Sequence, residues 1–563
     1  MAQCTQAVYS NDYADFILDD EREQPEENAC YDTVDGRWRI AYEPRQGNAP
    51  MEVASIGYSR IPGVYGLMAE GTEGFERTGN YRVAGPPLSL TGTDVVIAFI
   101  DTGINYADEL FRHSDGTSRI LAIWDQNVEE GPAPEGFSYG REYTRQEINH
   151  ALQQPAPYSV LPSRDENGHG SALAGVAAGR NREFTGAAPD AELVVVKLKQ
   201  AKTYLREFYL LPGDSVAFQE NDVMLAVAYV QRFLRKLNRP VVICIGIGTN
   251  QGDHSGQSPL GQYLDDVARQ RGMAVVVCGG NEGNAAHHFR GELIRQDYGQ
   301  PDFLRNVAEG VEIRVSEGCL GFCMELWGAA PDVYTISVQT PGGEQTPQIR
   351  YGVSRHVDYS FVFERSSVSI DSVLSEGNSG EELIFFRIVT PTPGIWTVKV
   401  TTVEPPQIGI FHMWLPIEGF INVPVSFLRP NPYTTLTEPA MTVNTISVST
   451  YDPINNSFYI NSGRGYSRIG GVNPHLSAPG VAVATGRGTM TGSGIAAALA
   501  AGTIAQFMQW AVVEGNIPLI SNKQLKSIFI RGAARERDEL YPNREWGYGR
   551  MDIEGSFRVI AGS

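Results

Sequence analysis

The chain has 563 residues, of which 42% are hydrophobic and 20% are charged, as is ordinary for a globular protein. This length exceeds what one hydrophobic core supports, so we expect two to four domains. The 65 acidic residues outnumber the 45 basic ones and give a net charge of −20. Phosphate binding needs clustered Lys and Arg, so this balance argues against nucleic acid and anionic membranes as partners.

The N-terminal sequence MAQCTQAVYSNDYADF has no basic start and no apolar core, so we expect no secretory signal and synthesis in the cytoplasm. No run of about 18 apolar residues predicts a membrane span. Six cysteines in a long chain without a signal favour reduced thiols. Cys319 and Cys323 are spaced like metal ligands, but no CxxC or HxxxH pair accompanies them. We therefore expect no metal and no other cofactor.

In chain order, residues 1–65 have the pattern of a small α+β unit, and the glycine-rich, polar segment 66–94 follows it as a linker. Short apolar runs then occur at 94–100, 192–198, 241–247 and 273–278, with amphipathic stretches such as 221–237 between the later ones. Continuous hydrophobic strands separated by helices predict a parallel sheet covered on both faces. We assign this α/β pattern to residues 95–302.

The pattern changes near residue 310. Seven or more short strand-like runs follow one another with Gly, Pro and Ser between them, including VEIRV, CMELW, LIFFRIV and WTVKVTTV. Such a series without helices predicts an antiparallel sandwich, which we assign to residues 303–432. The α/β pattern returns over 433–563 with a long helix of small residues from Gly494 to about residue 513. The sandwich is therefore expected to be an insertion within the α/β domain.

Three polar residues stand where the chemistry of α/β proteins is usually found. Asp101 ends the strand of FIDTGI, His169 precedes a helix rich in Ala and Gly, and Asn281 follows a strand in a glycine-rich loop. The carboxyl edge of a parallel sheet is where such proteins place ligands, and a side-chain amide there can stabilise an oxyanion. Each residue alone also fits a structural role, since Asp and Asn commonly form turns.

Together these motifs carry a resemblance. DTG, HGS, GNEG and a late small-residue helix, in the order Asp, His, helix, resemble the subtilisin-like serine proteases. Segments such as GTNQGDHSG, GNEGNAAHHF, INSGRGYSR and EWGYGRMDI resemble the germination-specific Csp subtilases of spore-forming clostridia. The resemblance covers essentially the whole chain. It implies an N-terminal prodomain, a subtilase core and a jelly-roll domain inserted in that core.

The family pattern breaks at the nucleophile. The segment TGSGIAAALAAG, aligned on IAAA and the closing AG, puts Gly494 where the family has its serine. Ser493 lies one residue earlier, and one residue turns a side chain by about 100° around a helix, away from His169.

Neighbouring family positions also differ. The substrate-binding strand reads Gly246, Ile247 and Gly248 instead of an SLG-type motif, and Leu499 replaces a histidine. Ser171 and His475 are milder changes. Because these positions have changed with the nucleophile, a serine restored at 494 is expected to return little activity.

The resemblance implies two functions. In subtilisin, loss of the nucleophile costs roughly 10⁶-fold in turnover, which favours an inactive protein that acts by binding, as a regulator or sensor in spore germination. Its partner would be a germination protease or a cortex-lytic zymogen, and the protein itself would be located with the spore. The alternative is an active endopeptidase that processes a protein zymogen and uses Ser493. Without self-cleavage, the prodomain is expected to remain attached and bound in cis.

Overall fold

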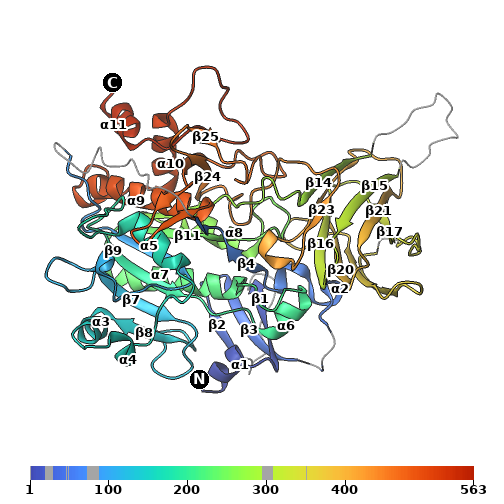
Figure 1. Cartoon of the computed structure of the whole chain (residues 1–563), viewed down its shortest axis with the longest axis horizontal. Helices are drawn as coiled ribbons and strands as arrows, with labels where there is room; N and C mark the ends of the chain where they lie inside the picture. Colours follow the sequence, from blue (N-terminus) through green and yellow to red (C-terminus); the bar gives the residue numbers. More distant parts are fainter. Residues whose placement is uncertain are drawn as a thin grey trace.

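The computed structural model describes residues 2–19, 30–45, 47, 50–72, 88–293, 308–349 and 352–562. A central α/β sheet carries helices on both faces, an antiparallel sandwich stands beside it, and a small N-terminal unit lies along both (Figure 1). This is the fold class that the sequence predicted, which is thereby confirmed. The domain boundaries expected from the sequence stay predictions.

The central sheet has the strand order β25-β24-β13-β11-β6-β9-β7-β8, and β26 pairs with β24. Pairing is parallel throughout except at the edges, where β8 and β25 are antiparallel to their neighbours. The strands are β6 (Val96–Asp101), β7 (Ile120–Asp125), β8 (Arg141–Thr144), β9 (Glu192–Lys197), β11 (Val241–Ile245), β13 (Met273–Cys278), β24 (Ile446–Asp452), β25 (Ser457–Phe458) and β26 (Leu476–Pro479). Because its central strands are buried on both faces, they read as unbroken apolar runs.

The two faces of the sheet contact different helices. On β6, Ile97 and Phe99 pack in one core cluster with α5 and α9, while Ala98 and Ile100 pack in the other with α7 and α8. The helices and helical turns of this part are η3 (Glu109–Phe111), α3 (Arg145–Leu152), α4 (Pro157–Val160), α5 (His169–Ala178), α6 (Thr203–Phe208), α7 (Glu220–Leu237), α8 (Pro259–Val267), α9 (Ser493–Met508), η5 (Gln509–Val513), α10 (Asn522–Gly532) and α11 (Ile553–Ala561). Short strands accompany them: β10 (Phe218–Gln219), β12 (Ile247–Gly248), β27 (Val483–Ala484) and β28 (Thr489–Thr491).

Helix α9 is the most buried of the helices that pack against the central sheet. Its small residues allow close approach to α5: a Cβ on Gly502 would lie 2.6 Å from the carbonyl oxygen of Ala177. Together with η5 it is long and apolar enough to cross a membrane by length and composition, but 83% of its most apolar window is buried inside the protein. This burial identifies it as a core helix.

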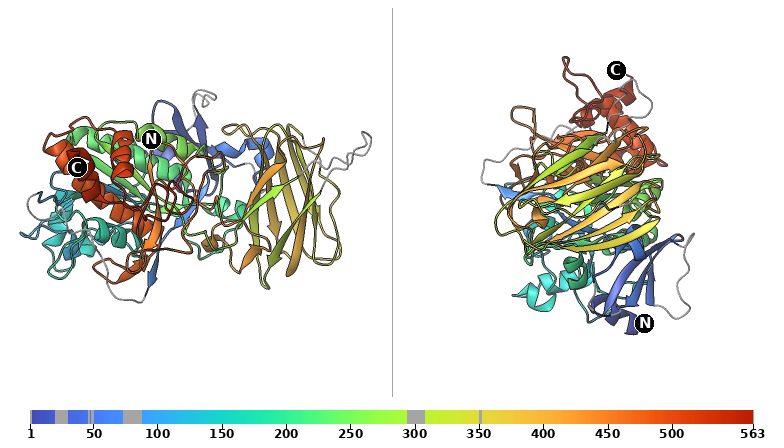
Figure 2. Two further views of the ribbon diagram at one scale, coloured as in Figure 1. Left: turned by 90° about the horizontal axis from the view of Figure 1, so that it is seen from above. Right: turned by 90° about the vertical axis from the view of Figure 1, so that its right-hand side faces the viewer.

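The inserted sandwich has a six-stranded sheet of order β14-β22-β16-β20-β19-β18 and a four-stranded sheet of order β17-β21-β15-β23. Its strands are β14 (His288–Glu292), β15 (Glu309–Val315), β16 (Gly321–Gly328), β17 (Tyr334–Gln339), β18 (Ser354–Ser360), β19 (Ser367–Val373), β20 (Glu382–Val389), β21 (Gly394–Thr402), β22 (Ile410–Trp414) and β23 (Val425–Phe427), with the turn η4 (Glu418–Phe420). The sheets enclose a hydrophobic core of their own and form one end of the molecule (Figure 2).

The N-terminal unit contains an antiparallel sheet of order β1-β3-β2. Its elements are α1 (Ala2–Tyr9), β1 (Tyr13–Asp19), β2 (Cys30–Thr33), β3 (Trp38–Pro44), α2 (Val53–Ile56), η1 (Tyr58–Arg60), β4 (Val64–Leu67) and β5 (Glu70–Thr72). The buried carboxylate of Asp15 joins it to the core by accepting hydrogen bonds from Lys202 and Gln219. Tyr58 joins it to the sandwich by donating to Glu325 at 2.8 Å.

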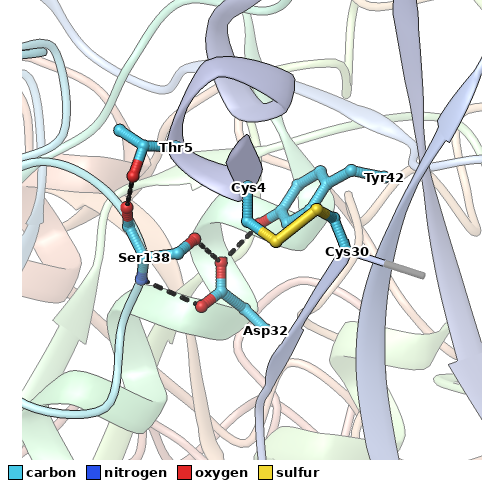
Figure 3. Close-up of a disulfide and its surroundings, with 6 residues drawn as sticks. All are labelled: Cys4, Thr5, Cys30, Asp32, Tyr42 and Ser138. Atoms are coloured by element: carbon cyan, nitrogen blue, oxygen red, sulfur yellow. Dashed lines mark hydrogen bonds between the residues drawn. A yellow bond between two sulfur atoms is a disulfide. The ribbon is translucent and has the colours of Figure 1, made fainter. Parts of the chain in front are cut away.

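One expectation about the cysteines is wrong. Cys4 and Cys30 form a disulfide between α1 and β2, whereas the sequence favoured reduced thiols throughout (Figure 3). The other four cysteines, Cys319 and Cys323 included, are free and buried. The disulfide lies beside a contact with the core, where Asp32 accepts hydrogen bonds from Ser138 and from Tyr42. Pairing was missed because it depends on how α1 packs against β2, which the spacing of 26 residues does not reveal.

Loss of this disulfide should destabilise the protein. A crosslink that closes a loop of 26 residues stabilises a fold by about 3 kcal/mol, chiefly by restricting the unfolded chain. We expect a Cys4→Ser/Cys30→Ser variant to lose about that much free energy of unfolding in urea, and dithiothreitol to shift the wild type equally. The same reagent should leave the double variant unchanged. A thiol titration that finds all six cysteines reactive in the unfolded, unreduced protein would contradict the pairing.

Candidate functional site

Asp101 and His169 form a buried pair at the carboxyl edge of the central sheet. Asp101 is the last residue of β6, His169 is the first residue of α5, and His169 Nδ1 lies 2.7 Å from Asp101 Oδ1. Both side chains are 1% exposed. A Cβ at Gly170 would lie only 2.3 Å from the carbonyl oxygen of Gly103, so glycine at 170 lets the helix start approach the loop after β6.

Asp165, which the sequence analysis missed, fixes the start of α5. Its carboxylate accepts hydrogen bonds from the backbone N–H groups of Gly168 and Ser171 and from the hydroxyl of Thr102. A carboxylate that satisfies free N–H groups at a helix start is a common cap. An acidic residue four positions before the histidine was the available signal. Asp165 therefore positions His169 without contacting it through a hydrogen bond.

The environment of His169 favours its protonated form. Burial lowers the pKa of the imidazole, but the charge of Asp101 and the hydrogen bond to it outweigh burial, so the pKa lies above its usual value. Asp101 at Nδ1 also fixes the ring so that Nε2 faces away from the carboxylate. Among the described residues, this Nε2 has no hydrogen-bond partner although it is buried.

Gly494, in the first turn of α9, faces that unpartnered nitrogen. A Cβ on Gly494 would lie 3.4 Å from His169 Nε2 and 3.3 Å from the carbonyl oxygen of Met68. The backbone N–H of Gly494 donates to that same Met68 oxygen at 2.9 Å. A hydroxyl one bond beyond the Cβ would thus stand between a base and a peptide carbonyl, which is the arrangement that acyl transfer requires.

Ser493 has a different environment. Its side chain is fully buried, and among the described residues its hydroxyl has no hydrogen-bond partner. The thiol of Cys278 nearby is buried as well, and burial raises its pKa to about 12. The backbone N–H of Ser493 donates to Asn281 Oδ1 at 3.0 Å. Asn281 thus lies at the start of α9, and it lines a pocket of about 400 Å³ together with Met68.

The segment from β4 to β5 runs through this site as an extended strand. β4 pairs antiparallel with β12, where Leu67 lies opposite Ile247 and Gly66 opposite Gly248, and Met68 donates to the Gly246 carbonyl at 3.2 Å. Beyond Gly494, β5 pairs antiparallel with β28. Both sides of the cleft are therefore occupied by the chain's own residues 64–72. Residues 73–87 of the expected linker lie outside the described part.

The other altered positions lie around this site or behind it. A Cβ on Gly246 would meet Leu173 Cδ1 at 2.5 Å and Asp101 Oδ2 at 3.4 Å, so a serine does not fit there unless Leu173 moves. The side chain of Leu499 lines a separate cavity of about 490 Å³. The Ser171 hydroxyl accepts from the N–H of Asn105. His475 is buried beside Lys526, and burial followed by the charge of Lys526 lowers its pKa.

A profile of the subtilase family (Peptidase_S8) matches residues 92–307 and 373–549, which is more than half of the chain. The chain belongs to the subtilase family. The interruption of the match falls within the sandwich, as expected for a domain inserted in the subtilase core. Asp101, His169 and Asn281 all lie inside the matched segments.

Among solved structures, the CspB protease of Clostridium perfringens matches with a TM-score of 0.74 and 26% sequence identity, over 86% of this chain and 99% of that one. This match confirms the resemblance to Csp-type subtilases. The patellamide maturation protease PatG (TM-score 0.37, 10% identity, 84% and 93% coverage) and the protease Apa1 of an Antarctic Pseudoalteromonas (0.31, 10%, 86% and 98%) are much more distant. A search of curated protein sequences finds no significant match.

Proposed function

We propose that this Csp-type subtilase is proteolytically inactive and acts by binding. The observation that carries the proposal is the place of Gly494 opposite His169. The base and its orienting carboxylate are in place, but Gly494 has no side chain at the position 3.4 Å from Nε2 where a Cβ would lie, and so no atom to attack a carbonyl. Catalysis that remains without a nucleophile comes from the oxyanion hole and from substrate binding, and amounts to about 10³–10⁴ over water. Such a rate does not serve a protease.

The alternative, an endopeptidase that uses Ser493, has less support. For Ser493 to act, its buried hydroxyl would have to turn toward His169, and the N–H of Ser493 would have to release Asn281. The first turn of α9 would also have to change conformation, and the hydrogen bond that the Gly494 N–H donates to the Met68 carbonyl opposes this change. These contacts oppose that rearrangement.

We also propose the biological setting from the resemblance to Csp proteases: a regulator or sensor of spore germination whose partner is a protein, either an active Csp-type protease or the cortex-lytic zymogen it processes. Residues 64–72 occupy both sides of the cleft, so a partner's peptide cannot enter it while they stay paired. Partner binding then falls to the sandwich or to the outer surface.

A fluorophosphonate probe tests the absence of a nucleophile. We expect no covalent labelling of the wild-type protein and no casein hydrolysis above background, because the probe reacts only with an activated serine. An active subtilase in the same sample controls for the reagent, and Ser493→Ala controls for the neighbouring hydroxyl. Labelling of the wild type that disappears in Ser493→Ala would overturn the proposal in favour of the endopeptidase.

A further inference from the structure

A pocket of about 400 Å³ lies at the amino edge of the central sheet, opposite the edge that carries Asp101 and Asn281. Its floor includes Val241 and Met273, the first residues of β11 and β13. Its walls come from the end of α7, the turns before β11 and β13, and the segment after α9. This volume is in the range of small-molecule sites, and the strands separate the pocket from the cleft.

The polar lining of this pocket consists of donors and amides and contains no carboxylate. It is made by Gln231, Arg235, Asn238, Arg239, Gln270 and Arg271. The composition is unusual for a chain of net charge −20, in which acidic residues outnumber basic ones by 65 to 45. The local surplus of positive charge therefore favours an anion over a cation or a neutral ligand.

Two buried donors in the pocket lack a hydrogen-bond acceptor. Gln231 is 5% exposed, and its Nε2 has no hydrogen-bond partner among the described residues, although its Oε1 accepts from Tyr263. Arg239 Nη2 is also buried without a hydrogen bond, although Asp94 Oδ1 lies within ion-pair distance at 3.8 Å. A buried donor left unpaired is unfavourable, so a ligand that supplies acceptors here gains affinity.

The charge at the rim is also unpaired. Arg235 and Arg271 are exposed, and neither forms an ion pair with a described side chain. Arg239, in contrast, forms an ion pair with Glu192, which also pairs with Arg145. A cation in the last turn of α7 suits the helix dipole, which accounts for the sign of Arg235. It does not account for the buried unpaired amide of Gln231. Guanidinium groups bind carboxylates and phosphates through two parallel hydrogen bonds, which fits an anion at this rim.

From this arrangement, we propose that the pocket binds a small organic anion that carries a carboxylate or a phosphate and a short apolar part. The anionic group lies between Arg235, Arg271 and the free donor of Gln231. The apolar part lies against Pro240, Met273 and Leu519, the last of which is 61% exposed at the rim. The site is independent of the cleft and of the proposed inactivity of the protein.

Thermal unfolding and equilibrium dialysis at constant ionic strength test the site, with inorganic phosphate, acetate, butyrate and hexanoate as probes. We expect saturable binding of one probe per chain and a midpoint of unfolding that rises with probe concentration. Phosphate binding stronger than hexanoate binding would assign a phosphorylated ligand; affinity that grows from acetate to hexanoate would assign a carboxylate with an apolar tail.

Charge reversal at the rim supplies the decisive comparison. Arg235→Glu/Arg271→Glu should weaken binding at least about tenfold, since each charged hydrogen bond contributes about a factor of ten. Arg182→Glu/Arg537→Glu makes the same charge change at two exposed arginines outside the pocket and should leave the affinity unchanged. Gln231→Leu tests the buried donor in a chain that keeps all its arginines. Equal binding by both double variants, or no saturable binding of any probe by the wild type, would overturn the proposal.

Discussion

Purified full-length protein should give a single intact mass of 61.6 kDa after prolonged incubation. The bond that follows Met68 is the one presented to the site, because Gly494 N–H holds the Met68 carbonyl and strands pair on both sides of it. No atom at position 494 can attack that carbonyl. A tethered strand also rebinds at an effective concentration of millimolar order, so the cleft should stay occupied. Intact-mass spectrometry of protein expressed alone measures the outcome.

His169→Ala is the matched control, since it removes the base and leaves the cleft strand in place. A cut between Met68 and Ala69 in the wild type that is absent from His169→Ala would overturn both the expected intact chain and the proposed inactivity. In Gly494→Ser we expect most of the protein to remain uncut. The added Cβ would lie 3.1 Å from the Gly246 carbonyl, a tight contact, and Gly246 itself leaves no room for a family-type serine.

Asp15→Ala should destabilise the fold by about 3–5 kcal/mol, because it leaves the ammonium of Lys202 buried without its counter-charge. Lys202 Nζ lies 2.6 Å from Asp15 Oδ1 and also donates to the carbonyls of Ala7 and Tyr13. Burial lowers the pKa of Lys202 although Asp15 opposes this, so the lysine without Asp15 would be expected to lose its proton more readily still. Urea unfolding followed by tryptophan fluorescence measures the loss.

Asp12→Ala is the matched control, since Asp12 is an exposed carboxylate in the same unit. We expect it to change the free energy of unfolding by less than about 0.5 kcal/mol. Asp15→Leu/Lys202→Met removes both charges and should recover much of the loss, because apolar residues of similar volume replace a buried ion pair at little cost. If Asp15→Ala were as stable as Asp12→Ala, the buried pair would not hold the N-terminal unit to the core.

Much of the central sheet was predictable because buried parallel strands form unbroken apolar runs. The run at 273–278 matches β13 residue for residue, and 221–237 matches all but the first residue of α7. The run at 241–247 instead divides into β11, which ends at Ile245, and β12, which begins at Ile247. The apolar run alone does not show this division. Only the resemblance, which assigns Gly246, Ile247 and Gly248 to the substrate-binding strand, indicates where the chain leaves the sheet for the cleft.

The site was predictable only as far as local motifs extend. Asp101, His169 and Asn281 stand in recognisable strand-end or helix-start segments. The position of the Met68 carbonyl beside Gly494 depends on contacts between segments far apart in the sequence. So does the position of Leu173, which leaves no room for a side chain at residue 246. The spacing of residues in the sequence does not reveal either. The disulfide was missed for the same reason.

The pairing of β5 with β28 also determines when the protein can finish folding. Gly71 lies opposite Met490, so the first half of that ladder leaves the ribosome about 419 residues before the second. At typical rates of synthesis, the interval is roughly 20 to 80 seconds. During that time the cleft has no α9 and the linker strand has no partner on that side. Contacts so distant in sequence form slowly, and the nascent core exposes apolar strands while it waits. The N-terminal unit is already synthesised by then, and its sheet can cover the α7 face of the core before the last helices emerge.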